Sequence, residues 1–169
     1  MKVLVTGGAG SFGQAFVSAV LPTAERVVVY SRDEGKHARF AEILQAPPEK
    51  IRFFLGDVRD RERLEEAMWR CDTVVHAAAL KRIDAVSYDP LETIRTNVLG
   101  TVNVIDAAIR AGVGRVVVLS SDKCCDPANL YGVTKLAAEF YAVQANAHAL
   151  PRGTRIACVR WGNVLGSRG

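Results

Sequence analysis

Short runs of β-branched residues alternate with helix-patterned stretches along the whole chain. Between the runs, apolar residues recur at helical spacing, as at Phe12, Ala15 and Phe16. Strands that alternate with helices in this way form parallel sheets with both faces covered. The pattern therefore predicts an α/β fold with a doubly wound parallel sheet of order 3-2-1-4-5-6. The expected strands are 2–6, 26–30, 51–55, 73–76, 115–119 and 154–160.

Turn residues indicate where the two longest of the five expected helices begin and end. Asp89 followed by Pro90 is typical of a capping residue and a proline in the first turn, which predicts a helix over about 90–111. That helix should stop near Gly112, and a last helix is predicted over 130–149. Because doubly wound sheets bind ligands beyond the carboxyl ends of their strands, we expect the functional residues to follow the strands.

Size and composition favour one globular domain spanning residues 1–169. An apolar fraction of 49% and a charged fraction of 24% are typical of such domains. The net charge of +4 comes from scattered basic residues, which argues against a nucleic-acid partner. No apolar run approaches the roughly 18 residues of a membrane span, and no leader precedes the first strand. We therefore expect a cytoplasmic protein with no membrane partner.

The four cysteines predict neither disulfides nor a metal site. They lack metal-binding spacing, and a chain of this size needs no disulfide to fold. We expect free thiols at Cys71, Cys124, Cys125 and Cys158.

A glycine-rich segment follows the first predicted strand and opens the first predicted helix. Glycines there let the backbone turn tightly and approach a pyrophosphate at the helix N-terminus, which predicts dinucleotide binding. The alternative is a tight turn without a ligand. The predicted coenzyme contacts in this segment are Gly7, Gly10, Ser11, Phe12 and Gly13.

The end of the second strand favours NADP over NAD. An NAD-specific protein usually carries an acidic residue there for the ribose 2′-hydroxyl, whereas this chain has Ser31 and Arg32. The Arg32 guanidinium and the Lys36 ammonium, one turn further on, suit a 2′-phosphate. In the alternative interpretation both cations belong to a solvated helix start, and Asp33 contacts the ribose.

Two more strand ends carry candidate coenzyme residues. After the third strand, Asp57 could accept from the adenine amino group while Val58 packs on the ring, or Asp57 could cap the next helix. After the fourth strand, Ala77, Ala78 and Ala79 allow close approach of the coenzyme. His76 in that strand is interpreted as a packed core histidine. Lys81 could meet a phosphate or a sugar, or could be solvated.

Tyr131 and Lys135 lie one helical turn apart after the fifth strand, which ends in Ser120-Ser121-Asp122-Lys123. A tyrosine is a poor base at its free pKa of about 10, but a neighbouring ammonium favours its anion. Lys135 could also hold the nicotinamide ribose. An ordinary pair on a helix surface is the alternative.

These motifs resemble the extended short-chain dehydrogenases/reductases, which have the Rossmann fold. Within them the chain is similar to the inverting UDP-N-acetylglucosamine 4,6-dehydratases of polysaccharide biosynthesis. The Asp122-Lys123 pair best distinguishes this group from its relatives, because other sugar 4,6-dehydratases have Asp-Glu at these positions and epimerases usually have neither. The segments that carry the resemblance are 6–13, 31–34, 56–60, 76–81, 96–100, 120–123, 130–135 and 160–169.

The resemblance implies a lyase reaction on a nucleotide sugar. Tyr131 would take the proton of the C4 hydroxyl while NADP⁺ takes the hydride, and Ser121 would polarise the C4 oxygen. Lys123 would remove the C5 proton and Asp122 would protonate the departing C6 hydroxyl. Hydride return to C6 and protonation of C5 from the opposite face would then invert C5 and regenerate NADP⁺. Asn97 would brace the site, and Lys81 and Asn163 would contact the substrate. A turn salt bridge or a helix cap is the structural alternative for Asp122 and Lys123.

The chain departs from the family pattern in three places. Trp161 stands where a tyrosine is expected, and Cys124-Cys125 replaces small residues. The chain also ends at Gly169, so we expect the substrate-binding lobe of similar proteins to be absent. The alternatives to a dehydratase are an epimerase or ketoreductase of the same superfamily and a non-catalytic NADP-binding module. A homo-oligomer is a further expectation.

Overall fold

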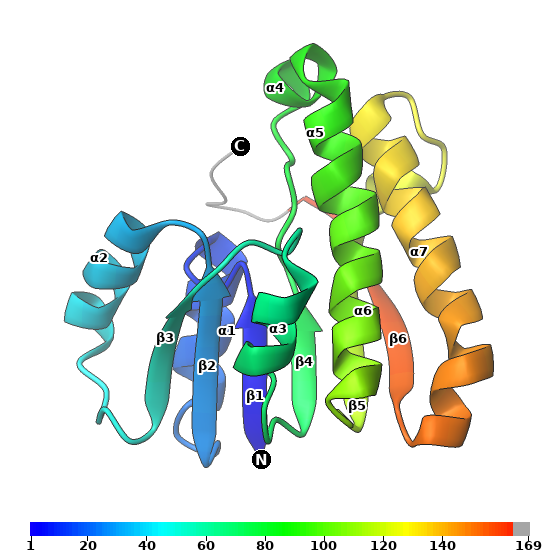
Figure 1. Cartoon of the computed structure of the whole chain (residues 1–169). Coiled ribbons are helices and arrows are strands. Elements are labelled where there is room, and N and C mark those ends of the chain that lie inside the picture. The colour runs from blue at the N-terminus through cyan, green and yellow to red at the C-terminus, as the bar shows by residue number, and fades with distance from the viewer. Residues whose placement is uncertain (164–169) are drawn as a thin grey trace.

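The computed structural model describes residues 1–163, except for the side chains of residues 83–85. Its centre is a six-stranded sheet of order β3-β2-β1-β4-β5-β6 in which every neighbouring pair is parallel (Figure 1). This confirms the predicted fold class and strand order. The strands are β1 (Lys2–Thr6), β2 (Arg26–Ser31), β3 (Ile51–Leu55), β4 (Thr73–His76), β5 (Arg115–Ser121) and β6 (Arg155–Trp161).

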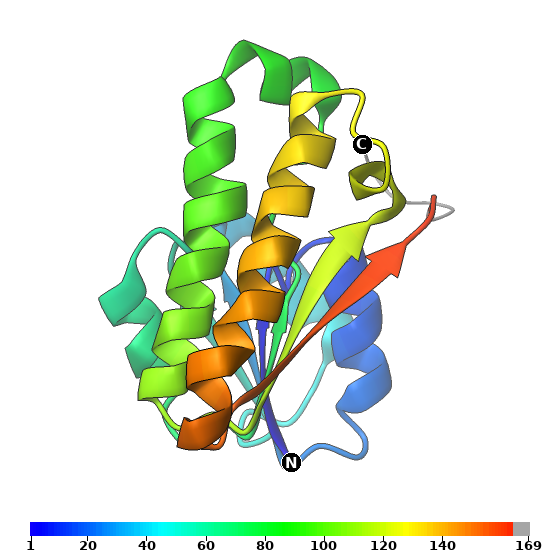
Figure 2. The same cartoon turned by 90° about the vertical axis from the view of Figure 1, so that its right-hand side faces the viewer.

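Helices cover the two faces of the sheet unequally. Figure 2 shows α6 and α7 on one side of the sheet and α1 on the other. The α-helices are α1 (Ser11–Val20), α2 (Glu34–Leu44), α3 (Arg61–Ala67), α4 (Ile83–Tyr88), α5 (Pro90–Ile94), α6 (Gly100–Arg110) and α7 (Leu130–Ala149). A π-helical turn η1 (Arg95–Leu99) joins α5 to α6, and η2 (Asp122–Cys124) and η3 (Leu150–Arg152) are single 3₁₀ turns.

Two apolar clusters sandwich the sheet. One contains residues of α3, α6 and α7 together with alternate residues of the strands, among them Leu4, Val74 and Val118. The other, on the α1 and α2 side, contains Val5 and Val29 of the opposite strand face. Because successive side chains of a strand point to opposite faces, β1, β2, β3 and β4 contribute to both clusters, whereas among the described residues β5 and β6 contribute only to the first. Burying each such side chain contributes about 1.5–3 kcal/mol.

The expected helix over 90–111 is present in three parts. Pro90 begins α5, but the Asp89 side chain makes no cap hydrogen bond, and η1 interrupts the regular helix before α6. The chain leaves α6 through Gly112, which has a φ of +70°. The predicted span was therefore right, but a π-turn in its middle was not foreseen.

Strand β5 is longer than expected and β6 lies one residue later than expected, because the two strands continue to pair beyond their predicted ends. Ser121 pairs with Trp161, which extends β5 and β6 together toward the carboxyl edge. Helix α7 begins where it was predicted, and the Asn129 side chain caps it by accepting from the Gly132 amide at 3.0 Å. Helix α4 was not predicted.

Candidate active site

The glycine-rich loop joins β1 to α1 and packs against the loop after β4. Gly7 has a φ of +66°, and a Cβ there would lie 2.8 Å from the Ala78 nitrogen. A Cβ on Gly13 would overlap the Gly8 backbone, so these glycines are required by close backbone approach. Gly10 is the N-cap of α1 and supplies no side-chain cap, which leaves the first amide groups of the helix available to an anion.

The first residues of α1 lie beside the end of β6. Ser11 is exposed, whereas the Phe12 ring packs edge-on against Trp161 with centroids 4.9 Å apart. Trp161 therefore replaces the expected tyrosine as a packing partner of the glycine-loop helix. Its buried indole nitrogen has no hydrogen-bond partner among the described residues.

His76 ties the end of β4 to β1 and α6. It is 1% exposed, and its ring nitrogens lie 2.7 Å from Thr6 Oγ1 and 3.0 Å from Thr101 Oγ1. Burial lowers the pKa of His76 to about 3. The amides of Ala77 and Ala78 both donate to Thr6 Oγ1. These contacts agree with the interpretation of His76 as a core residue and fix the alanine loop that also includes Ala79. Lys81, after this loop, is exposed.

The predicted phosphate-binding residues meet at the carboxyl end of β2. Arg32 pairs with Asp57 at 3.6 Å, and Lys36 pairs with Asp33 at 2.9 Å. The Asp33 carboxylate also caps α2 by accepting from the Lys36 amide, so both of its oxygens have partners. The Lys36 hydrogen bonds lower the pKa of Asp33.

Ser31 completes this group through a contact that the sequence did not reveal. Its hydroxyl lies 2.6 Å from Nε2 of His37, which is 7% exposed.

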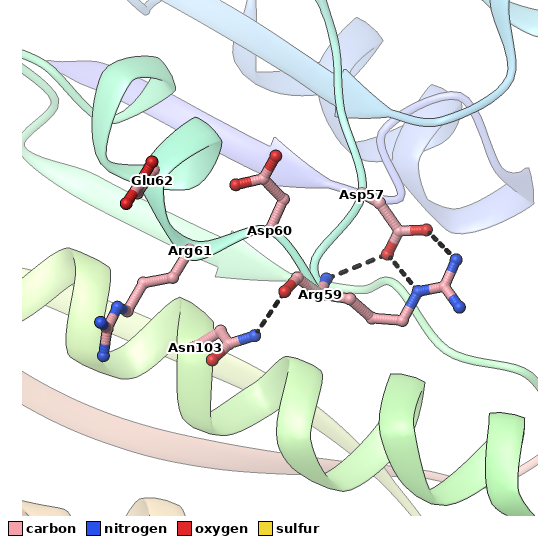
Figure 3. Close-up of a pocket in the computed structure, with 6 residues that line it drawn as sticks. All are labelled: Asp57, Arg59, Asp60, Arg61, Glu62 and Asn103. Carbon is pink, nitrogen blue, oxygen red and sulfur yellow. Dashed lines mark hydrogen bonds and ion pairs between the residues drawn. The ribbon is translucent and has the colours of Figure 1, made fainter.

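Asp57 lies on the loop after β3, but Asp60 caps α3 instead, by accepting from the Arg63 amide at 3.0 Å. The alternative of Asp57 as the cap is therefore wrong. Arg59 folds back onto Asp57, donating from Nε and Nη2 at 3.0 and 2.7 Å (Figure 3). Burial alone would raise the pKa of Asp57, but Arg59 and Arg32 lower it overall.

Arg59 is a residue that sequence reasoning missed. It also donates to Glu92 of α5 at 2.6 Å, so it clamps the β3–α3 loop to that helix. An open pocket of about 610 Å³ lies beside this loop (Figure 3). Its lining comes from the loop, the start of α3 and α6. The lining residues are Asp57, Arg59, Asp60, Arg61, Glu62 and Asn103. Val58, between the first two, is buried.

Tyr131 and Lys135 occupy successive turns at the start of α7. Burial raises the pKa of Tyr131, while a hydrogen bond with Ser121 and the charge of Lys123 act in the opposite direction. Lys135 is 5% exposed, donates from Nζ to the Leu119 carbonyl, and has its pKa lowered to about 8 by burial. The Tyr131 phenol therefore lies near the Ser121 hydroxyl and the Lys123 amine.

Asp122 and Lys123 form an ion pair within η2. Lys123 Nζ lies 3.2 Å from Asp122 Oδ1 and 3.2 Å from Asn163 Oδ1. The Ser121 hydroxyl also donates to Asp122 at 2.9 Å, and these hydrogen bonds lower the pKa of Asp122. The salt bridge that was the structural alternative for Asp122 and Lys123 is thus present.

Gly132 brings this turn against helix α7. A Cβ on Gly132 would overlap the Lys123 carbonyl oxygen. Only a glycine lets α7 approach the turn this closely, so Tyr131 and Lys123 are held near each other by backbone contact.

Asn97 braces the site from the π-turn. Its Oδ1 accepts from the Leu80 amide at 2.8 Å, and its Nδ2 donates to the Leu80 carbonyl and to Thr134 Oγ1 at 2.9 and 3.1 Å. It is 1% exposed. Asn97 therefore joins the loop after β4 to α7 through direct contacts.

The cysteines are free, and two of them flank an ion pair that the sequence did not reveal. Arg160 donates to Glu139 at 2.6 Å, while Cys124 contacts Glu139 at 3.4 Å and Cys125 contacts Arg160 at 3.5 Å. Within the described part of the chain, no group of three His, Cys, Asp or Glu side chains could hold a metal ion. Residues 164–169 of the last family-like segment lie outside the described residues.

Comparison with known families gives one match that spans almost the whole chain. Residues 3–169 match the family described as "Polysaccharide biosynthesis protein". A UDP-N-acetylglucosamine 4,6-dehydratase (inverting) from Campylobacter jejuni is 47% identical over 170 residues, which are 99% of this chain and 50% of that protein. A UDP-glucose 4-epimerase from Rickettsia felis is 42% identical over 173 residues, with the same two coverages.

Solved structures have the same fold. Pen from Bacillus thuringiensis superposes with a TM-score of 0.96 at 40% identity, covering 99% of this chain and 54% of that one. DesIV, a dTDP-glucose 4,6-dehydratase from Streptomyces venezuelae with NAD and TYD bound, gives 0.85 at 29% identity, covering 95% and 55%. The chain thus spans about half the length of the relatives it matches. None of the described helices is long and apolar enough to cross a membrane.

Proposed function

Because the chain belongs to the polysaccharide biosynthesis protein family, we propose that it is the coenzyme-binding and catalytic part of an NADP-dependent nucleotide-sugar 4,6-dehydratase. The observation that carries this proposal is the Asp122–Lys123 ion pair beside Tyr131. Dehydration across C5 and C6 needs a base and an acid in addition to the residues that oxidise C4.

The strand ends fit a dinucleotide. The amide groups at the start of α1 have no side-chain cap and suit a pyrophosphate. The glycines of the preceding loop allow the close backbone approach that such a ligand needs. Ser31, Arg32 and Lys36 would hold a 2′-phosphate, and Lys135 would hold the nicotinamide ribose. When bound, the coenzyme supplies a reversible hydride acceptor.

Tyr131 begins the reaction as the base for the C4 hydroxyl. Burial favours the neutral phenol, so ionisation of Tyr131 depends on the Ser121 hydrogen bond and the Lys123 charge, which act in the opposite direction. Ser121 is placed between the phenol and Asp122, where its hydroxyl could polarise the C4 oxygen. Once C4 is a ketone, the C5 proton becomes acidic.

One proton shift within the ion pair prepares the elimination. In the resting pair Asp122 is ionised and Lys123 is its ammonium partner, which is the reverse of what a base at C5 and an acid at C6 require. Moving one proton along the 3.2 Å hydrogen bond produces an amine and a carboxylic acid. Desolvation by a bound sugar favours this neutral pair, because burying two charges is costly. Lys123 then takes the C5 proton, and Asp122 gives its proton to the C6 hydroxyl, which leaves as water.

An epimerase is the second candidate, and the 42% identity to a UDP-glucose 4-epimerase favours it. An epimerase would use Tyr131 and Lys135 but would have no need for Lys123. The coenzyme could also be NAD, as in the DesIV structure. The two cations after β2 support NADP.

The distinguishing experiment incubates the protein with NADP⁺ and UDP-N-acetylglucosamine. We expect loss of one water from the sugar by mass spectrometry, with no net reduction of coenzyme, because the hydride taken from C4 would return to C6 while C5 regains a proton. Lys123→Gln should abolish loss of water yet allow C4 oxidation, so that reduced coenzyme accumulates in a single turnover. Tyr131→Phe should slow both steps by about 10²–10⁴-fold.

Lys50→Gln is the matched control, because Lys50 precedes β3 at the opposite edge of the sheet. Unchanged dehydration in Lys123→Gln would contradict the assignment. Binding of NADP⁺ by the wild-type protein without any product would favour the non-catalytic binding module.

A further inference from the structure

A buried histidine contacts the residue that we place at the 2′-phosphate. His37 lies in the first turns of α2, and its Nε2 is 2.6 Å from Ser31 Oγ at the end of β2. The ring packs against Phe53 of β3 with centroids 5.4 Å apart, which fixes its plane. His37 therefore faces the predicted coenzyme site only through the Ser31 hydroxyl.

The neighbouring cations are already engaged. Arg32 pairs with Asp57 and Lys36 pairs with Asp33, so carboxylates offset the positive charge that would attract a phosphate. A neutral hydrogen-bond donor beside these ion pairs therefore affects the affinity for a phosphate more than it would beside unpaired cations. Ser31 carries the hydroxyl that could be this donor.

The direction of the Ser31–His37 hydrogen bond decides what Ser31 offers. A hydroxyl has one proton to donate. If Nε2 is unprotonated, Ser31 donates to it and presents only lone pairs, which repel a phosphate. If Nε2 carries a proton, His37 donates to Ser31 and the hydroxyl proton is available to a phosphate oxygen.

We propose that His37 is a specificity-determining residue that, by holding a proton on Nε2, turns the Ser31 hydroxyl toward the 2′-phosphate of NADP. This inference rests on the NADP preference in the proposed function. Burial lowers the pKa of His37, against the charge of Asp33, so the free protein holds the neutral ring. A neutral ring can place its one proton on either nitrogen, and the phosphate selects Nε2.

Affinity measurements with two substitutions test the proposal. His37→Phe keeps an aromatic ring but has no donor, so we expect the preference for NADP⁺ over NAD⁺ to fall about fivefold to tenfold, with NAD⁺ affinity unchanged. His37→Gln places an amide donor near the position of Nε2 and should keep the preference within about twofold. The measurement is the dissociation constant of each coenzyme by calorimetry.

Ser31→Ala supplies the matched control. It should lower the preference at least as much as His37→Phe, and the double variant should lower it no further than Ser31→Ala alone, because His37 acts only by orienting the Ser31 hydroxyl. Additive losses would overturn the proposal, and so would a full preference in His37→Phe.

Nitrogen NMR of the wild-type protein gives a readout that needs no catalysis. With 2′,5′-ADP bound, His37 Nε2 should be protonated, whereas 5′-AMP should leave the free-state tautomer unchanged. An unprotonated Nε2 in the 2′,5′-ADP complex would overturn the role of His37 and leave the NADP assignment intact. Equal affinity of the wild-type protein for NADP⁺ and NAD⁺ would instead remove the NADP assignment and this inference with it.

Discussion

His76 is held in one neutral tautomer by its hydrogen bonds. The Thr101 hydroxyl donates to the Asn97 carbonyl at 2.7 Å, so its oxygen accepts from His76 Nε2. The Thr6 oxygen accepts from the amides of Ala77 and Ala78, so its proton goes to Nδ1. A proton on Nδ1 would leave two donors facing each other. Burial of the ring, which disfavours its charged form, lowers the pKa of His76 to about 3.

We predict that His76 makes the protein acid-sensitive. The pKa of His76 rises to about 6.5 on unfolding. Below that pH the histidine is therefore protonated in the unfolded state but stays neutral in the folded state. Stability should fall as the pH drops from about 6.5 toward 3, by about 2.5 kcal/mol between pH 7 and pH 4.5. Urea unfolding at pH 7 and pH 4.5 measures this loss. His76→Gln should be less stable at pH 7 but should lose much less on acidification; an equal loss would contradict the assignment.

Single residues were predictable where one physical requirement governs them. The apolar setting of His76 indicated a core residue, and the glycine loop indicated close backbone approach, as found at Gly7 and Gly13. Arg59 was not predictable, because its partners Asp57 and Glu92 meet only after α5 folds beside the β3–α3 loop. Sequence spacing alone does not indicate such a contact.

Helix α7 and the η2 turn are in contact because Gly132 has no side chain between them. We predict that Gly132→Ala separates them, since the added Cβ would overlap the Lys123 carbonyl oxygen. The cost should be about 1–3 kcal/mol of unfolding free energy. Activity should fall by at least about tenfold even where the variant remains folded, because Lys123 moves relative to Tyr131. Thermal unfolding and single-turnover kinetics are the measurements.

Gly35→Ala is the matched control for an alanine in a helix. Gly35 lies in α2, where a Cβ would meet only the Asp33 carboxylate, at 3.6 Å, and the Arg39 side chain, at 3.9 Å. Its replacement should stabilise the protein by about 0.5–1 kcal/mol through helix propensity. Normal activity in Gly132→Ala would show that the turn adapts without consequence.

Elements were predictable where a periodic pattern and a turn residue coincide. Helix α7 was located to the residue, since Asn129 and Pro151 bracket a continuous helical pattern. The π-turn was not foreseen. Within it, Asn97 contacts both Leu80 and Thr134, which are distant in the sequence. Such contacts are tertiary and leave no mark on local spacing.

The strand order was predictable for the whole molecule, because parallel strands joined by helices permit few arrangements. The strand order does not determine how completely helices cover each face of the sheet. Parallel sheets normally bury both faces. On the α1 side of β6, Ala157 is exposed and Val159 is 44% exposed, although Cys158 on the other side packs against the core cluster.

This face predicts how the chain behaves in solution. Within the described residues β6 pairs only with β5, so it offers an open row of backbone groups beside exposed Val159. Such an edge promotes strand pairing between copies, and a lysine on it opposes that pairing. Val159→Lys should weaken self-association by at least about tenfold in sedimentation velocity over a concentration series. Val143→Lys is the control, because Val143 is equally exposed but lies on α7. Equal weakening by both substitutions would show that net charge, rather than the β6 edge, governs association.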